Sequence, residues 1–160
     1  MTINIICIGK LKESYWREAC SEYIKRLGAY GSAKIVELSE MRLSDNPSEG
    51  EIAKCLENEA KAILPYMEQK NSYNIAMCIE GSQLSSEVLA QKIDSAMVSG
   101  SSTVNFVIGS SFGLADSVKR RADFKLSISK MTLPHQLARV VVCEQDYRAF
   151  AINNGSKYHK

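Results

Sequence analysis

The sequence predicts an α/β domain with a mainly parallel sheet and helices on both of its faces. Short apolar runs such as "INIICIG" (3–9) are bounded by glycine, which is typical of strands buried on both sides. Amphipathic segments of helical length alternate with these runs, as they do in strand–helix–strand units. A length of 160 residues fits a single domain, 1–160, that can bury a core.

The strands follow from apolar runs rich in β-branched residues. "INIICIG" is the first, and "AKIVEL" is a shorter second one before the polar, turn-rich loop "SEMRLSDNPSEG". "YNIAMCIEG" and "TVNFVIG" are again continuous apolar runs that end in glycine, and "FKLSIS" is a short last one. The predicted strands are 3–9, 33–38, 73–81, 103–109 and 124–129.

The helices follow from periodicity and from end signals. The first, 14–28, ends at Gly28, and the second, 50–67, places Ile52, Leu56, Ala60 and Ile63 on one side. The third, 85–100, begins with Ser85 or Ser86 ahead of Glu87 and ends at Gly100. The last begins at Pro134, a residue favoured at the first helical position, and runs to Asn153.

Composition excludes several classes of protein. No apolar run approaches the roughly 18 residues that cross a bilayer, and the opening segment lacks the features of a signal peptide, so we expect a cytoplasmic protein without a membrane partner. The five cysteines are odd in number and form no CxxC pair, which favours reduced, buried thiols over a metal site or a disulfide framework.

Charge is unevenly distributed along the chain. Residues 119–160 contain nine Lys or Arg and three Asp or Glu, a net +6, whereas the first 118 residues carry −4. A basic C-terminal quarter suits a phosphate-rich partner, although a scattered solvated surface would give the same count.

Three strand ends predict a ligand site. "CIEG" (78–81), "FVIGSSFG" (106–113) and "SISKMTLP" (127–134) each follow a buried strand, and in open parallel sheets ligands bind beyond the carboxyl ends of the strands. Glycine allows a ligand to approach the backbone closely. Neither a GxGxxG fingerprint nor a GxxxxGK[ST] loop is present, so a crevice for a small molecule is better supported than a Rossmann or P-loop nucleotide site.

The helix from Pro134 carries polar residues among apolar ones on both sides. A projection at 100° per residue separates two faces: Leu137, Val140, Val141, Glu144, Arg148 and Ala151 on one, and His135, Arg139, Val142 and Asp146 on the other. Glu144 and Arg148 form an i,i+4 pair, either as a structural ion pair or as part of an interface bordering a site. Apolar residues on both faces suggest that the sheet covers one and a second copy of the chain the other.

These segments resemble a known family. "FVIGSSFGL", "LSISKMTLPHQLARVVVCEQDYRAF", the terminal "YHK", "CIGKLKESYWREACSEYIKRLGAY" and "IEGSQLSSEVLAQKI" are similar to the RlmH family of SPOUT-class methyltransferases, over nearly the whole chain. The resemblance implies an α/β knot with a deep C-terminal trefoil knot and a homodimer. It also implies S-adenosylmethionine-dependent methylation of N3 of a pseudouridine in bacterial 23S rRNA. The base would lie in the large-subunit stem-loop that faces the small subunit, with the assembled ribosome as substrate.

The resemblance also assigns roles to residues. The expected cofactor pocket consists of Met77, Ile79, Gly81, Gly109, Gly113, Ile128, Ser129, Lys130, Met131, Thr132 and Leu133. The family usually has leucine at Met77 and glycine at Ser110, where this chain adds a side chain beside the cofactor loop. The expected catalytic residues are Glu144, Arg148, His135, Tyr158 and His159, and the expected RNA contacts are Arg139, Lys157 and Lys160.

Two other readings remain open at this point. One is a non-catalytic RNA-binding or ribosome-associated module that uses the basic C-terminal surface alone. The other is an unrelated α/β enzyme acting on a small molecule. Binding of S-adenosylmethionine would distinguish the methyltransferase from the non-catalytic module. Association with ribosomes would distinguish the methyltransferase from the unrelated enzyme.

Overall fold

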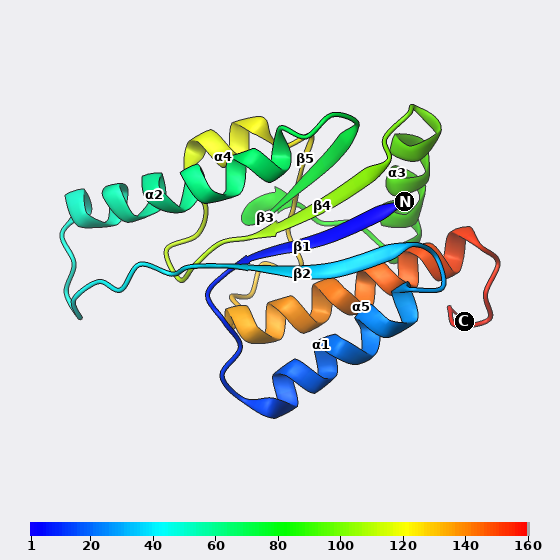
Figure 1. Ribbon diagram of the computed structural model, residues 1–160, viewed down its shortest axis with the longest axis horizontal. Coiled ribbons are helices and arrows are strands. Elements are labelled where there is room, and N and C mark those ends of the chain that lie inside the picture. The colour runs from blue at the N-terminus through cyan, green and yellow to red at the C-terminus, as the bar shows by residue number, and fades with distance from the viewer. Residues whose placement is uncertain (160) are drawn as a thin grey trace.

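A computed structural model, which describes residues 1–159, contains one five-stranded sheet in which all neighbouring strands are parallel (Figure 1). The strand order is β2-β1-β4-β3-β5. The bounds are Thr2–Ile8 for β1, Ser32–Leu38 for β2, Ser72–Ser82 for β3, Thr103–Ile108 for β4 and Phe124–Leu126 for β5. The predicted parallel α/β architecture is confirmed.

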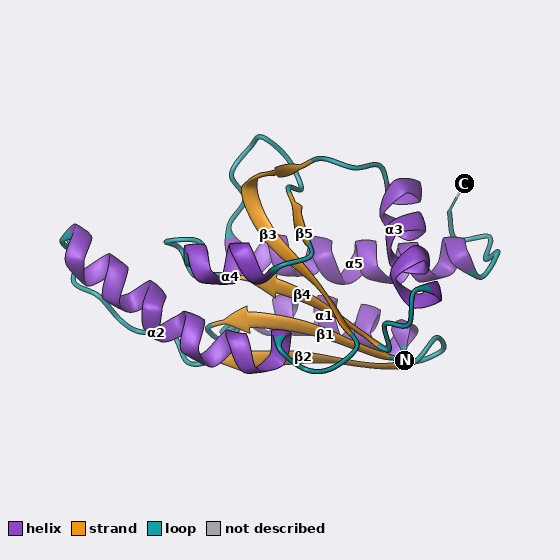
Figure 2. Ribbon diagram, turned by 90° about the horizontal axis from the view of Figure 1, so that it is seen from above, coloured by secondary structure: helices purple, strands orange, loops and turns teal. Residues whose placement is uncertain are grey.

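Five helices cover both faces of this sheet, in three layers (Figure 2). Their bounds are Ser14–Leu27 for α1, Glu49–Met67 for α2, Ser86–Val98 for α3, Asp116–Arg121 for α4 and His135–Asn153 for α5. Buried residues of α1, α3 and α5 pack with Ile3, Ile5 and Cys7 of β1, whereas those of α2 and α4 pack with Ile6 and Ile8. Alternate residues of β1 thus enter two different cores, which explains its unbroken apolar run.

Helix ends follow the sequence signals closely. Ser48 caps α2 and forms a reciprocal capping box with Glu51, while Ser85 caps α3 by accepting a hydrogen bond from the Val88 amide. Helix α5 begins at His135, so Pro134 occupies the N-cap and not the predicted first helical position. The sequence prediction missed α4 and made the last strand too long, since only 124–126 pair with β3.

Three asparagines link the central strands on the side covered by α2. Asn4 of β1 donates to Asn105 of β4 at 2.8 Å, and Asn105 donates to Asn74 of β3, also at 2.8 Å. Asn105 also donates to the Tyr66 carbonyl in α2. Since buried amides are costly unless hydrogen-bonded, this ladder favours one strand register and one position of α2.

Helix α5 packs on the rest of the chain through the face that carries Arg139, Val142 and Asp146. The fully buried side contains Arg139, Val142, Cys143, Asp146, Ala149 and Phe150. Leu137, Val141 and Glu144 lie on the other side and are only partly buried. Of the two faces that the projection separates, the more polar one is therefore the one that packs inside this chain. The second copy of the chain and the trefoil knot stay predictions.

Among residues 1–159, no helix combines the length and apolar character needed to span a membrane.

Candidate functional site

A cavity of about 630 Å³ lies at the carboxyl ends of β3, β4 and β5. Its walls are residues 77–80 at the end of β3, the loop 108–114 after β4, most of the loop 126–134 after β5, and the first turn of α5. The crevice predicted from three glycine-bearing strand ends is therefore present in the structure, and its position agrees with the rule for open parallel sheets.

Most of the expected cofactor residues line this cavity, as does His135 from α5. They are Met77, Ile79, Gly109, Gly113, Ile128, Ser129, Met131, Thr132 and Leu133. Gly81 and Lys130 do not line it, although both lie beside residues that do. The lining residues that the site assignment left out include Phe112, Lys119 and Gln136.

Two of the glycines are required by the protein's own packing. A Cβ on Gly81 would lie 2.7 Å from the backbone of Leu126 in β5, so this glycine permits close pairing of β3 and β5. A Cβ on Gly109 would lie 2.1 Å from the Gly113 carbonyl oxygen. Gly113 itself has a φ of +83°, a left-handed conformation that favours glycine. Any side chain at position 109 would therefore deform the loop before a ligand could bind.

The cavity leaves apolar side chains facing solvent. Met131 is 76% exposed and Ile79 64% exposed, and Phe112 and Ile128 are also exposed. Large apolar side chains that gather around one hollow mark a surface that a ligand or partner covers. A cofactor with a flat aromatic ring would find apolar side chains here to pack against, so the residues present fit S-adenosylmethionine.

Local hydrogen bonds shape the loop between β5 and α5. Ser129 Oγ accepts from the Met131 amide at 3.0 Å, and Ser127 Oγ donates to the Ser129 carbonyl at 3.0 Å. The Ser127 amide donates to the Ser82 carbonyl, which ties the loop to the end of β3. On the far wall Lys119 forms an ion pair with Glu80, and its ammonium lowers the pKa of that carboxyl.

The predicted residues of the C-terminal tail form a second cluster at the other end of α5. Tyr158 Oη donates to Glu144 at 3.0 Å, and Arg148 Nε donates to the same carboxylate at 2.9 Å. The Arg148 guanidinium also lies over the Tyr158 ring. The fold thus brings together four of the predicted residues, which we call the tail cluster: Glu144, Arg148, Tyr158 and His159. Tyr158 and His159 lie against the helix.

Both ring nitrogens of His159 are engaged. Nδ1 lies 3.2 Å from Arg148 Nη1, and Nε2 lies 2.8 Å from a Glu87 oxygen in α3. A guanidinium only donates and a carboxylate only accepts, so Nδ1 is the acceptor and Nε2 carries the proton. A proton added to Nδ1 would face the guanidinium. His159 can therefore act as a base only after it moves away from Arg148.

Tyr158 is held as a neutral donor. Burial, followed by its hydrogen bond to Glu144, raises the pKa of Tyr158 to about 12. At neutral pH the phenol keeps its proton, so Tyr158 can donate a hydrogen bond or stack on a ring but does not remove a proton.

The cavity and the tail cluster lie far apart within one chain. Arg148 follows His135 by 13 positions on α5, which at 1.5 Å per residue corresponds to about 20 Å. In Figure 1 the C-terminus lies at the opposite end of α5 from the loops that form the cavity. Of the five expected catalytic residues, only His135 lines the cavity of its own chain.

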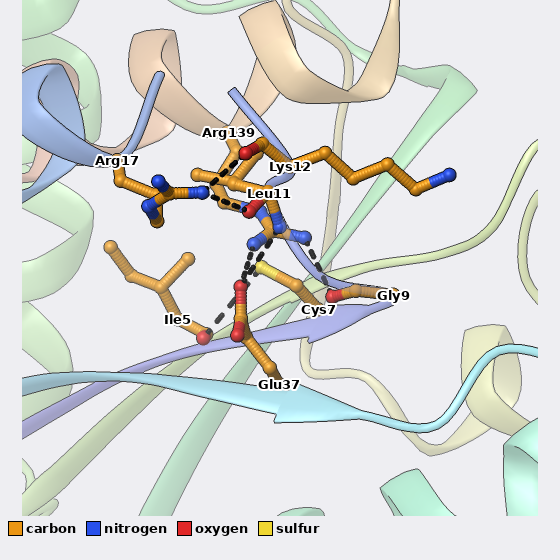
Figure 3. A network of polar contacts seen from close by, with 8 residues as sticks. All are labelled: Ile5, Cys7, Gly9, Leu11, Lys12, Arg17, Glu37 and Arg139. Atoms are coloured by element: carbon orange, nitrogen blue, oxygen red, sulfur yellow. Dashed lines mark hydrogen bonds and ion pairs between the residues drawn. The ribbon is translucent and has the colours of Figure 1, made fainter. Parts of the chain in front are cut away.

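Arg139 is not placed for contact with RNA. Its side chain is buried between α5, β1 and β2, where it pairs with Glu37 at 2.7 Å and donates to the Gly9 carbonyl at 3.1 Å (Figure 3). Glu37 also accepts from the Leu11 amide, so the pair joins α5 to the loop after β1. Arg139 thus has a structural role, which corrects the expected RNA contact. Lys157 is exposed, whereas Lys160 lies outside the described residues.

No group of three or more His, Cys, Asp or Glu side chains arranged to hold a metal ion occurs within residues 1–159.

Comparisons with known proteins show the fold and the family of this chain. The chain has the fold of a probable methylase family protein from Haemophilus influenzae Rd KW20, with a TM-score of 0.53 and 16% identity over 99% of this chain and 70% of that one. It is 48% identical to the ribosomal RNA large subunit methyltransferase H of Bacillus thuringiensis (strain Al Hakam), over the full length of both chains. The same enzyme of Bacillus cereus (strain B4264) is also 48% identical over both full lengths. A family model described as predicted SPOUT methyltransferase matches residues 1–159. The chain therefore belongs to the SPOUT methyltransferases and, among them, to the ribosomal RNA large subunit methyltransferase H family.

Proposed function

We propose that this protein is an S-adenosylmethionine-dependent methyltransferase of ribosomal RNA. Its target is N3 of a pseudouridine in 23S rRNA, in the large-subunit stem-loop that faces the small subunit, and its substrate is the assembled ribosome. The observation that carries the proposal is the cavity at the ends of β3, β4 and β5, whose walls include most of the expected cofactor residues. A protein that acts on the assembled ribosome would function in the cytoplasm.

The cofactor contributes a methyl group that its sulfonium already activates. What remains for the protein is to align the acceptor with that methyl group and to deal with the proton on N3. Each pH unit by which the pKa of N3–H exceeds the ambient pH costs about 1.4 kcal/mol, so a nearby cation or proton acceptor accelerates transfer.

The tail cluster has the groups that this task needs. The Arg148 cation can stabilise the N3 anion, and the Glu144 carboxylate keeps that cation in position. The Tyr158 ring offers a surface for stacking a base and a phenol that donates a hydrogen bond. His159 can accept the proton once it leaves its contact with Arg148. His135 lies on the cavity wall, where it would adjoin both cofactor and base.

The separation along α5 means that one chain cannot supply both parts of this site. We propose a homodimer in which two α5 helices pack with opposite directions about a two-fold axis. Such a pair would put the tail cluster of one protomer beside the cavity of its partner. The partly buried Leu137, Val140 and Val141 offer an apolar stripe for this contact. Lys157 and Lys160 would then contact RNA phosphates near the shared site.

The proposal is tested by methyl transfer from isotopically labelled cofactor to ribosomes, followed by mapping of the modified nucleotide. We expect label in the large-subunit RNA at N3 of a single pseudouridine, and far less on protein-free 23S rRNA. Binding of the cofactor without any transfer to ribosomes or RNA would contradict the proposed activity. Binding of ribosomes without the cofactor would support the non-catalytic module.

A further inference from the structure

Glu59 is a buried carboxyl group that no part of the site described so far uses. It lies on α2, is 4% exposed, and has no Lys, Arg or His nitrogen within ion-pair distance among residues 1–159. Ser110 Oγ donates to one oxygen at 2.9 Å, and the Cys55 thiol approaches the other at 3.5 Å. Burial raises the pKa of Glu59, and these two hydrogen bonds partly oppose the effect. Burying a carboxyl group without an ion-pair partner costs free energy, so its position in the fold requires an explanation.

The hydrogen bond from Ser110 reaches the cavity. Ser110 is the second residue of the loop 109–113, which forms one wall of that cavity. Inside the loop the Gly113 amide donates to the Ser110 carbonyl at 2.9 Å, and Gly109 has no room for a side chain. The Ser110 hydroxyl is directed to α2, so Glu59 holds the turn 110–113 of this wall from outside.

We propose that Glu59 is a positioning residue of the cofactor site, which holds the loop 109–113 in its binding shape through the hydroxyl of Ser110. This inference rests on the proposed function. Because the RlmH pattern usually has glycine in place of Ser110, the side-chain anchor is a feature of this chain, and α2 becomes part of the cofactor site without touching the ligand.

The expected effect is on affinity. A loop released from its anchor samples other shapes, and only the fraction in the binding shape takes the cofactor, so the apparent Kd rises in inverse proportion to that fraction. If the anchored shape falls to between a fifth and a tenth of the population, the Kd rises about five- to tenfold. Once the cofactor is bound the loop is ordered again, so kcat at saturating cofactor changes little.

The test measures the Kd of S-adenosylmethionine by calorimetry in four variants. Ser110→Ala removes the donor and Glu59→Ala the acceptor, and we expect each to raise the Kd about five- to tenfold. In the double variant the Kd should be no higher than in the weaker-binding single variant, because both substitutions remove the same hydrogen bond between Ser110 and Glu59. Glu59→Gln keeps an amide oxygen at the acceptor position and should stay within about twofold of wild type.

The control is Glu57→Ala, an exposed carboxylate on the same helix, whose Kd should equal that of wild type. Thermal unfolding of every variant identifies general destabilisation. If Glu59→Ala does not fold, the Kd of Ser110→Ala, the smallest change, decides the test. An unchanged Kd in Ser110→Ala, or losses that add fully in the double variant, would overturn the positioning role while leaving the proposed function standing. Absence of any cofactor binding by wild type would overturn both.

Discussion

The two ends of α5 are built in different ways. At its start, loops from three strands form a cavity with backbone groups, glycines and exposed apolar side chains, and with one ion pair on the wall. At its end, charged and aromatic side chains form a hydrogen-bonded network on the helix surface, with the tail folded against it. One end can enclose a ligand, and the other can stabilise charge.

For the proposed reaction, neither end is a complete site. The cavity has His135 and the Lys119–Glu80 ion pair on its wall, whereas the tail cluster has the Arg148–Glu144 ion pair and none of its four residues lines this cavity. A reaction that needs an enclosed cofactor and charge stabilisation at one point must unite the two ends. About 20 Å of rigid helix separates them in one chain, so a second chain is the simplest means.

The largest expected effect comes from removing the tail. Deletion of residues 158–160 takes away the Tyr158 ring and the His159 imidazole, and it leaves the loops of the cavity untouched. We expect methyl transfer to ribosomes to fall by about two orders of magnitude or more, because an acid–base or charge-stabilising group typically contributes that much. Calorimetry should give a cofactor Kd within a few-fold of wild type, and full activity of the shortened chain would remove the tail from the site.

A smaller effect is expected at the cavity. Met131→Ser removes an exposed apolar side chain that a bound cofactor would cover. Loss of about 1–2 kcal/mol of apolar burial should weaken cofactor binding roughly tenfold. Val98→Ser is the matched control, since Val98 is 82% exposed at the end of α3 and lines no part of the cavity. Equal cofactor affinity in the two variants would argue against the cavity as the cofactor site.

The middle of α5 should affect folding and not the site. Asp146 is fully buried, neither of its oxygens has a hydrogen-bond partner, and burial holds its pKa well above the ordinary value. The folded state therefore retains a proton that the unfolded chain releases near pH 4, and stability falls as pH rises from there toward the folded pKa, by about 1.4 kcal/mol per unit. In Asp146→Asn the free energy of unfolding should no longer fall with pH in this way. Denaturant titrations between pH 4 and 8 would measure the slope in both proteins. An equally steep slope in the variant would assign it to other groups.

The smallest expected effect concerns the position of His159. The Ser85 hydroxyl and the backbone, with a further contribution from His159, lower the pKa of Glu87 to about 2, so this carboxylate is ionised at neutral pH and accepts from Nε2. Glu87→Gln keeps an acceptor oxygen and removes the charge. We expect a twofold to fivefold fall in methyl transfer at saturating cofactor, with an unchanged Kd for the cofactor. Wild-type activity in Glu87→Ala would show that the contact is incidental.

Much of the architecture could be predicted from the sequence, because the central strands are buried on both faces and appear as unbroken apolar runs. The cavity was predictable for the same reason, since three of those runs end at one edge of the sheet. The short helix α4 was missed because "DSVKRR" is too brief to display a periodicity. The sequence did not show which face of α5 meets the sheet, because Arg139 and Asp146 are polar residues on its buried side.

Contacts between residues far apart in the sequence could not be predicted in the same way. The resemblance named Glu144 and the Tyr158-His159 pair, but periodicity alone gives no sign that the tail folds back on α5. Glu59 could have been noticed, because it lies four residues before Ile63 and three after Leu56, within the apolar stripe of α2. Its partner Ser110 lies 51 positions later, and only the fold brings the two together.

The central claim is that the cavity of one protomer works with the tail cluster of its partner, and a mixed dimer tests it directly. Thr132→Trp blocks the cavity, and a second variant lacks residues 158–160. Each alone should be nearly inactive on ribosomes. Refolded together in equal amounts, they should form about half mixed dimers, each with one site in which an intact cavity meets an intact tail. The account predicts that the mixture regains about a quarter of wild-type activity per chain. A mixture as inactive as its two components, with mixed dimers demonstrated by mass, would contradict it.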